Sequence, residues 1–455
     1  MAENDKMFAL GHDPIGKLLL RYSLPAIAGM VVFSLYNIID SVFIGHGIGP
    51  LAISGLAVAF PMMNLVFAFS LLIGIGGASV SSLRMGAKDI EGAFRVLGNV
   101  VVLNIIVAIG FGWLSFYFLD EILIAFGASA ESLPYGRDFM QIILLGLPVT
   151  YMMFNLNHIM RATGYPQKAM ISSIVTVVIN VILAPIFIFW LEWGTRGAAI
   201  ATVIAQLCGL WWVLHHFMNQ SSTIHFKRGI YQWRGKIIKN ILAIGMSPFF
   251  MNICGCSVVV VLNAGLKNYG GDMAIGAFGI INRVLSLFVM VVIGLTQGMQ
   301  AIIGFNYGAK NFARVKQTLT YGLIAAASFM ALGTLIAEVF PRQIAEIFTD
   351  DSELIQFSVT GLRFTMIVFP IVGCQIVIQN FFQAIGKAKI SIFLSTTRQL
   401  LFLIQCLLIL QYFWGLTGIW ISIPLTDFLA FTLAASVLII FFKKMNRVQI
   451  LAERE

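Results

Sequence analysis

Residues 24–44, LPAIAGMVVFSLYNIIDSVFI, decide the fold class of this protein, because the run is long enough to cross a bilayer as a helix. The run also contains a carboxylate, Asp40. An Asp at the centre of a transmembrane helix costs about 2.5 to 3.5 kcal/mol on insertion scales, so it indicates a functional site. Helical spacing places Phe33, Tyr36, Asn37 and Asp40 on one face. In the alternative interpretation, Asp40 lies near the helix end and extends toward the lipid headgroups.

The composition of the whole chain agrees with a membrane location. Of the 455 residues, 59% are hydrophobic and 11% are charged, whereas soluble domains have a charged share near a quarter. Apolar runs of about 20 residues, the length that a bilayer core requires, predict twelve spans. We place them at 17–44, 51–75, 94–118, 135–158, 169–190, 197–218, 239–262, 273–300, 315–338, 357–380, 391–413 and 417–442. The expected fold is an all-α polytopic membrane protein.

The longest polar interruption divides these spans six and six. It predicts a first lobe at 1–218, a cytoplasmic linker at 219–238 and a second lobe at 239–455. With both termini in the cytoplasm, most of the 29 Lys and Arg residues fall in cytoplasmic segments, Arg161 and Arg398 among them. The start of the chain has no cleavable signal pattern, so we expect the first span to direct insertion into a bacterial cytoplasmic (inner) membrane.

The two halves repeat each other. An offset of 222 residues lays Gly86-Ala87-Lys88 on Gly308-Ala309-Lys310 and Pro148 on Pro370, and an offset of 223 lays Pro25 on Pro248. Because six spans is an even number, the repeats have the same topology and predict two pseudo-symmetric six-helix lobes with a path between them. With the offset of 223, Asp40 falls on Asn263, so the acid is present in one half only.

No metal or cofactor site is expected. The five cysteines lie in apolar segments, and the six histidines form no cluster with zinc-ligand spacing. The coupling ion of a transporter, a proton or Na⁺, would be the only ion needed.

Four stretches taken together resemble the multidrug and toxic compound extrusion family, and in particular its bacterial DinF-like multidrug branch. They are DSVFIGHGIGPLAISGLAVAFP, LRMGAKD, GFNYGAKNFARV and NHIMRATGYPQKAM, which occur in this order and partly at half-chain spacing. The resemblance covers essentially the whole chain. It implies an antiporter with twelve transmembrane helices and no enzymatic activity.

The resemblance also implies a cation or proton site in the first lobe. Asp40 would bind the ion, with polar groups that match Asn157, Asn180 and Thr202, and Asn37 lies beside it on the first helix. DinF-like members often carry a second Asp four residues after the fifth-span Asn, where this chain has Ala184. The departure favours a proton mechanism with a single acid, although oxygen ligands around one Asp suit either ion.

Further polar residues in the spans are candidates for the substrate cavity. Helix positions and half-chain equivalence give Phe33, Tyr36, Gln206, Gln375, Gln379 and Asp427. Hydrogen bonds between helices, or to backbone groups freed by Pro424, explain the Gln residues and Asp427 as well. The 20 Met and 38 Phe residues suit a cavity for lipophilic cations.

The expected function is export of small amphipathic or cationic drugs in exchange for protons or sodium ions. We expect a monomer that contacts membrane lipids and binds no nucleic acid. One alternative is a lipid-linked saccharide flippase of the same superfamily, which needs cavity cations to meet a diphosphate, and Arg283 is the only cation expected there. An alternative of another class is a polytopic membrane transferase, for which no acid or histidine pair is found.

Overall fold

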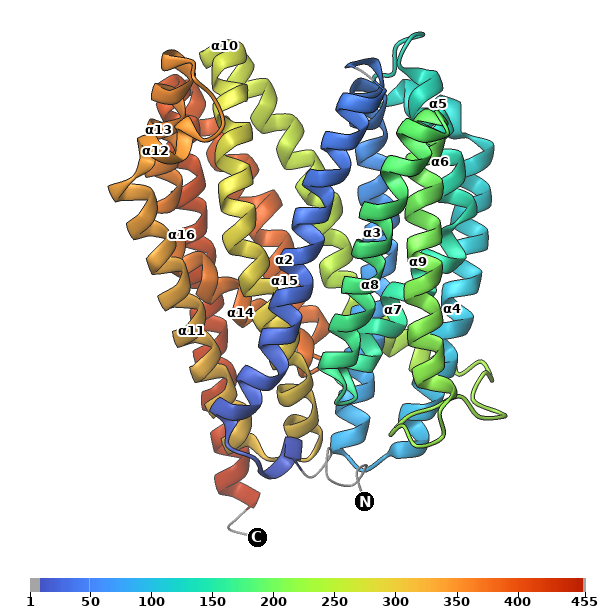
Figure 1. The fold of residues 1–455 in the computed structure, drawn as a ribbon. Coiled ribbons are helices and arrows are strands. Elements are labelled where there is room, and N and C mark those ends of the chain that lie inside the picture. The colour runs from blue at the N-terminus through green and yellow to red at the C-terminus, as the bar shows by residue number, and fades with distance from the viewer. Residues whose placement is uncertain (1–8, 49, 453–455) are drawn as a thin grey trace.

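The computed structural model describes residues 9–48 and 50–452, and it gives the backbone alone at 36–38, 40–42, 45–47, 50, 53 and 446–452. Over these ranges the chain forms helices and no strands. Figure 1 shows two groups of helices side by side, the first from the N-terminal half and the second from the C-terminal half. The predicted all-α class is therefore confirmed.

The first group contains six spans. Its elements are α2 (Ile15–Gly47), α3 (Pro50–Gly86), α4 (Ile90–Tyr117), α5 (Leu119–Ala125), α6 (Leu133–Leu145), α7 (Leu147–Ala162), α8 (Pro166–Pro185), the π-helix η1 (Ile186–Trp190) and α9 (Gly194–Met218). Helices α6 and α7 form one span bent by 59°, and η1 extends α8. The bend falls where Pro148 opens α7, since a proline cannot donate the hydrogen bond that would continue the preceding helix.

The second group repeats this order. Its elements are α10 (Gly235–Gly308), α11 (Phe312–Val339), α12 (Pro341–Glu346), α13 (Ser352–Met366), α14 (Phe369–Ala384), α15 (Ala388–Thr396), the π-helix η2 (Thr397–Leu403) and α16 (Ile404–Ala452). Helices α13 and α14 form one span bent by 52°, with Pro370 at the start of α14 as Pro148 is at the start of α7.

Helix α10 is a hairpin that supplies two spans, and α15, η2 and α16 together supply two more. A straight helix of the 74 residues of α10 would be about 110 Å long, far more than the roughly 30 Å of a bilayer core. Instead α10 reverses at Gly271, whose φ of 63° suits glycine, and α16 is interrupted at Gly415, with φ 55°. With each bent pair counted as one span, the described chain has the predicted twelve spans in two six-helix lobes.

The two lobes are locked together at one end of the molecule, where α2 begins and α16 ends; we call it the termini end (Figure 1). There α3 and the second half of α10 cross at two glycines. A Cβ on Gly86 would strike the carbonyl of Phe305, and a Cβ on Gly308 would strike the carbonyl of Leu83. Leu83 and Phe305 are themselves related by the 222-residue offset, so the crossing is pseudo-symmetric.

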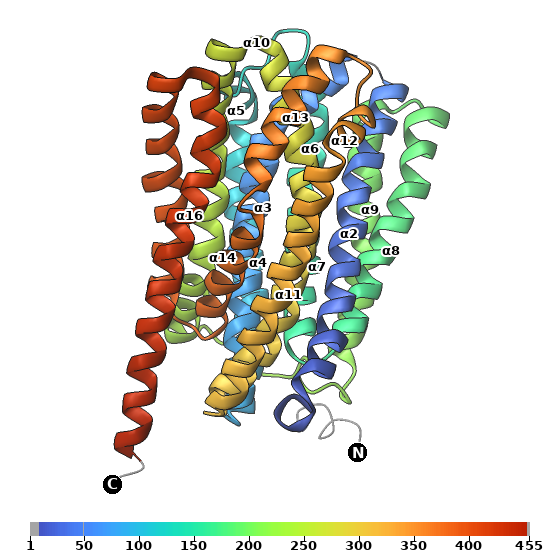
Figure 2. The same cartoon turned by 90° about the vertical axis from the view of Figure 1, so that its left-hand side faces the viewer.

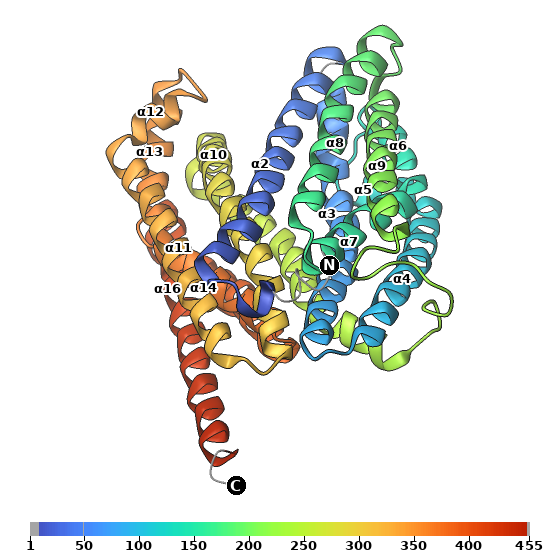
Figure 3. The ribbon, with the colours of Figure 1, turned by 60° about the horizontal axis from the view of Figure 1, so that its bottom comes forward.

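The first helix of each lobe packs into the core of the other lobe. Leu18 and Tyr22 of α2 belong to the buried core of the second lobe, and Ile237 and Ile241 of α10 belong to that of the first. Figure 3 shows α2 and α10 between the two groups, which diverge toward the end opposite the termini end. In the rotated view of Figure 2, α16 extends beyond the other helices at the termini end.

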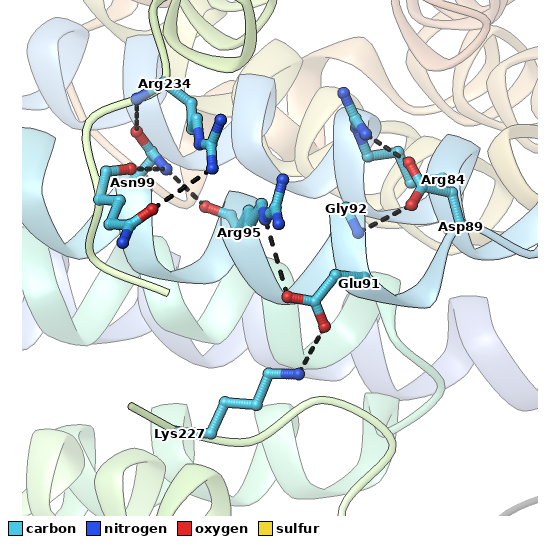
Figure 4. Close-up of polar contacts among 9 residues, drawn as sticks. Arg84, Asp89, Glu91, Gly92, Arg95, Asn99, Lys227 and Arg234 are labelled. Atoms are coloured by element: carbon cyan, nitrogen blue, oxygen red, sulfur yellow. Dashed lines mark hydrogen bonds and ion pairs between the residues drawn. The ribbon is translucent and has the colours of Figure 1, made fainter. Parts of the chain in front are cut away.

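The segment between the lobes, residues 219–234, lies against α4 without forming a helix. Lys227 forms an ion pair with Glu91, with 2.6 Å between Nζ and Oε2, and the side chain of Asn99 bonds the backbone of Gln232 and Arg234 (Figure 4). Ile230 is buried in the first-lobe core, whereas Tyr231 and Trp233 are exposed. The connection is therefore anchored on the first lobe.

The repeated Gly-Ala-Lys motif is a turn between spans. Lys88 and Lys310 both have positive φ, 60° and 59°, and the next residue of each caps a helix. Asp89 accepts from the backbone of Gly92 at the start of α4, and Asn311 accepts from that of Arg314 at the start of α11. A sharp, capped turn explains why the sequence repeats here.

Candidate functional site

A cavity of about 350 Å³ lies between the two lobes. Helices α2, α3, α7, α8 and α9 line it from the first lobe, and α10, α14 and η2 line it from the second. Its size is at the lower end of the range for sites that bind drug-sized ligands, about 300 to 1,000 Å³. Because both lobes contribute, a relative movement of the lobes changes its shape and access.

The wall on the first lobe is largely apolar and aromatic. Phe33, Phe67 and Phe154 contact one another, with ring centroids 6.1 to 6.3 Å apart. Methionines lie around the cavity on both lobes, at Met30, Met153, Met170, Met251 and Met290. Flexible, polarizable Met side chains adapt to ligands of different shape, and aromatic faces attract cations.

Two groups of amide and hydroxyl side chains interrupt this wall on α8 and α9. Asn180 donates to Thr202 Oγ1 at 3.1 Å, and Thr202 donates to the carbonyl of Ala198. Gln206 accepts a 2.5 Å hydrogen bond from Thr150. Asn180 and Thr202 thus lie next to each other and place polar side chains on the cavity wall.

A cationic side chain, Arg161, lies at the C-terminal end of α7. Arg161 donates through Nη2 to Asn157 Oδ1 at 2.9 Å, and through Nη1 to Gln297 on the second half of α10. Asn157 is itself fixed by hydrogen bonds to Ser172 and to the carbonyl of Ala169. The Arg161–Gln297 contact therefore joins the two lobes at the cavity wall.

A second arginine approaches the cavity from η2. Arg398 donates through Nε and Nη2 to Oδ1 of Asp427, at 2.9 and 2.8 Å, and Asp427 is buried behind it in α16. A π-helix widens one turn of a span and often occurs at functional sites, which suits the placement of a long cation here. Gln379 and Gln383 of α14 complete this wall.

The structure brings six of the predicted site residues to this one cavity. They are Phe33, Asn157, Asn180, Thr202, Gln206 and Gln379. Gln375 is buried in α14 and does not line the cavity, and Asp427 contacts the cavity only through Arg398. The side chains of Tyr36, Asn37 and Asp40 lie outside the described residues, although the backbone there is part of α2.

Two arginines on the cavity were missed. The charge count placed Arg161 and Arg398 in cytoplasmic segments, but both line the cavity, whereas Arg283 is exposed and is not among the lining residues. The expectation that Arg283 is the one cavity cation is therefore wrong. The position of Arg398 inside the apolar run 391–413 was a sequence signal for a cavity residue. For Arg161 the signal was its spacing from Asn157, because one helical turn places both residues on one face.

No group of three or more His, Cys, Asp or Glu side chains capable of holding a metal is found among the described residues. The five cysteines are free. Within the described part of the chain, the chemistry of the cavity is thus that of amides, hydroxyl groups, thioethers, aromatic rings, one histidine and two guanidinium groups.

Comparison with known proteins agrees with this architecture. The family model MatE matches residues 25–186 and 248–408, one match in each lobe. This chain belongs to the MATE family. The multidrug export protein MepA of Staphylococcus haemolyticus is 27% identical over 418 residues, which cover 92% of each chain, and MepA of Staphylococcus aureus strain MSSA476 is 24% identical over 96% of each.

Among MATE structures, that of the multidrug transporter DinF-BH is 34% identical to this chain, with a TM-score of 0.86. The match covers 93% of this chain and 95% of the DinF-BH chain. An outward-facing multidrug resistance transporter of the family has a TM-score of 0.90 at 23% identity over 98% of each chain, which shows the shared fold. The relatives of this MATE chain are thus transporters.

Proposed function

We propose that this MATE protein is a secondary active antiporter that exports small amphipathic or cationic drugs in exchange for protons or Na⁺. The observation that carries the proposal is the cavity between the lobes. Its walls combine the Phe33, Phe67 and Phe154 rings and flexible methionines with a few amide groups, which is the usual composition of a small-molecule site. MepA and DinF-BH are described as multidrug transporters.

Transport would proceed by alternating access between lobes 1–218 and 239–455. In this proposal, the close crossing at Gly86 and Gly308 would keep the termini end closed, and the exchanged first helices would couple the movement of one lobe to the other. The Arg161–Gln297 contact is a hydrogen bond between lobes that such a movement would break. The proposed setting is the bacterial cytoplasmic membrane, with a monomer surrounded by lipid.

Coupling would depend on Asp40 in the first lobe. Asn180 and Thr202 supply neighbouring polar groups at the cavity wall. Ala184 is fully buried in an apolar core, so this position adds no second carboxylate. A single acid supports proton exchange in preference to a sodium site of several carboxylates.

Drug accumulation in a bacterial host that lacks its own exporters tests this proposal. Cells that express the protein should accumulate less of a fluorescent amphipathic cation than cells with the empty vector, and an uncoupler should abolish the difference. Equal accumulation in both cell types would reject drug export.

The lipid-linked saccharide flippase remains a second candidate because Arg161 and Arg398 line the cavity. However, Asp427 already balances the charge of Arg398, so the described cavity offers one unbalanced guanidinium group to a ligand that carries a diphosphate. Purified protein in vesicles that contain a fluorescent lipid diphosphate distinguishes the two functions. Flipping without drug transport would favour the flippase.

The transferase alternative gains no support from the cavity, because no acid or histidine pair lies among the described lining residues.

A further inference from the structure

Arg161 is a cation in an unusual environment. Its guanidinium group is partly buried at the cavity and contacts the neutral amide oxygens of Asn157 and Gln297. Among the residues that the structure describes, no carboxylate pairs with it. Removing a charge from water is costly unless a counter-ion compensates, so this position favours an anion that arrives from the cavity.

The guanidinium group has donors left for such an anion. Arginine carries five N–H donors, and the contacts to Asn157 and Gln297 engage one on Nη2 and one on Nη1. The remaining donors of a guanidinium group can bind a carboxylate through two parallel hydrogen bonds. Asn157, fixed by Ser172 and Ala169, holds the fork in place without competing for its charge.

The other charged groups of the described cavity do not offset Arg161. Arg398 is balanced by Asp427, and His158, one turn before Arg161, adds no negative charge. The described lining residues include no Asp or Glu. Among the described lining residues, the balance is therefore one unpaired positive charge beside apolar and aromatic walls.

We propose that Arg161 is a recognition site for the carboxylate of zwitterionic amphipathic substrates. The proposal rests on the proposed drug export and names a residue that would determine specificity within it. One unpaired guanidinium group matches one carboxylate, while the Phe33, Phe67 and Phe154 rings and the methionines contact the apolar and cationic parts of the same molecule. A diphosphate, with more negative charge, would exceed what Arg161 balances.

A matched pair of dyes tests this site on the purified full-length protein in detergent. A cationic rhodamine ethyl ester and the zwitterionic free acid of the same dye differ only in the carboxylate, and fluorescence polarization measures the binding of each.

Arg161→Gln should weaken binding of the free acid about tenfold and change binding of the ester less than about twofold. Arg161→Lys, which keeps the charge but loses the fork, should fall between wild type and Arg161→Gln for the acid. Arg342→Gln, an exposed position outside the cavity, should leave both affinities unchanged.

Competition on the wild-type protein avoids any folding defect of the variants. Benzoate, but not the neutral benzamide, should displace the free-acid dye. Equal weakening of acid and ester by Arg161→Gln, or equal competition by benzoate and benzamide, would reject the carboxylate site and leave drug binding intact. If wild-type protein binds neither dye, the drug cavity and the carboxylate site are both wrong.

Discussion

Arg398 and Asp427 form an ion pair that spans the second-lobe wall of the cavity, from a π-helix to the buried face of the last span. Both contacts of the guanidinium group, at 2.9 and 2.8 Å, converge on Oδ1. The side chain of Asp427 is 6% exposed and that of Arg398 28%, so the acid is buried and the cation faces the cavity. The pair places a guanidinium group on the cavity wall and balances its charge at the same time.

Removal of either partner should destabilise the protein. Asp427→Asn leaves Arg398 without its counter-ion, and we expect the free energy of unfolding to fall by about 2 kcal/mol. This value is below the range for fully buried pairs, because Arg398 retains contact with the cavity. The double variant Arg398→Gln with Asp427→Asn should recover most of the loss, since no uncompensated charge remains. Thermal unfolding in detergent measures both. Glu346→Gln, which breaks an exposed pair with Arg342, serves as control and should change little.

The glycine crossing at the termini end predicts a second effect on stability. Gly86→Ala or Gly308→Ala places a methyl group against the backbone carbonyl of the facing helix, and overpacking of this kind costs about 1 to 3 kcal/mol. The control is Gly110→Ala in α4, where an added Cβ meets no atom within 4 Å. That variant should be neutral or more stable, because Ala is the better helix former. Melting temperatures that rank Gly110→Ala lowest would contradict the packing.

Much of the fold can be predicted from the sequence, because a lipid bilayer strictly limits the backbone structures that can cross it. Backbone groups in lipid must bond within a helix, so apolar runs of sufficient length predict spans directly. The run lengths identified the hairpins of α10 and α16, which reverse at Gly271 and Gly415. Local geometry does not follow as directly. Pro148 and Pro370, which the sequence shows as a repeated pair, coincide with the two bends, whereas the π-helices at 186–190 and 397–403 have no comparable signal.

The candidate site followed from the sequence only in part, and for a physical reason. Polar residues inside apolar runs stand out, which identified Gln379, whereas Asn180 and Thr202 followed from the family resemblance. Basic residues near span ends agree with the positive-inside rule even when their side chains point into the cavity, so charge counting assigned Arg161 to the cytoplasm. The packing of two helices against each other decides the direction of such a side chain. A sequence pattern within one helix does not contain that information.

Topology gives a third prediction, which follows from the distribution of Lys and Arg along the chain. We expect the segment 219–234 in the cytoplasm and the α12–α13 connection outside. Single cysteines at Gln220 and Ser352, both exposed, replace native residues in a cysteine-free background. Ser222 would be a poor choice, since it is buried and bonded to the carbonyl of His216. In intact cells an impermeant thiol reagent should label position 352 and not 220. The reverse pattern would invert the proposed orientation.

The fourth prediction concerns Asp40, whose helix, α2, packs against both lobes. The first turns of α2 lie in the second-lobe core, and Gly29, Met30 and Phe33 line the cavity. An acid in a low-dielectric region is stabilised by binding a proton or a cation, so its occupancy would bias how α2 packs. Substrate binding and ion binding would then be linked through one helix, and linkage requires the coupling to be reciprocal.

Asp40→Asn should therefore abolish uphill drug efflux and leave folding intact, because it removes an expensive charge and keeps the size of the side chain. We expect its melting temperature to match or exceed that of wild type. Reconstituted wild-type protein should transport in sodium-free buffer when a pH gradient is imposed, since Ala184 offers no second carboxylate for sodium. Thr202→Val, which removes the hydroxyl group bonded to Asn180 and preserves shape, should slow transport without abolishing it. An Asp40→Asn protein that exports at the wild-type rate under the same gradient would exclude Asp40 as the coupling residue, and transport that requires sodium would exclude the proton.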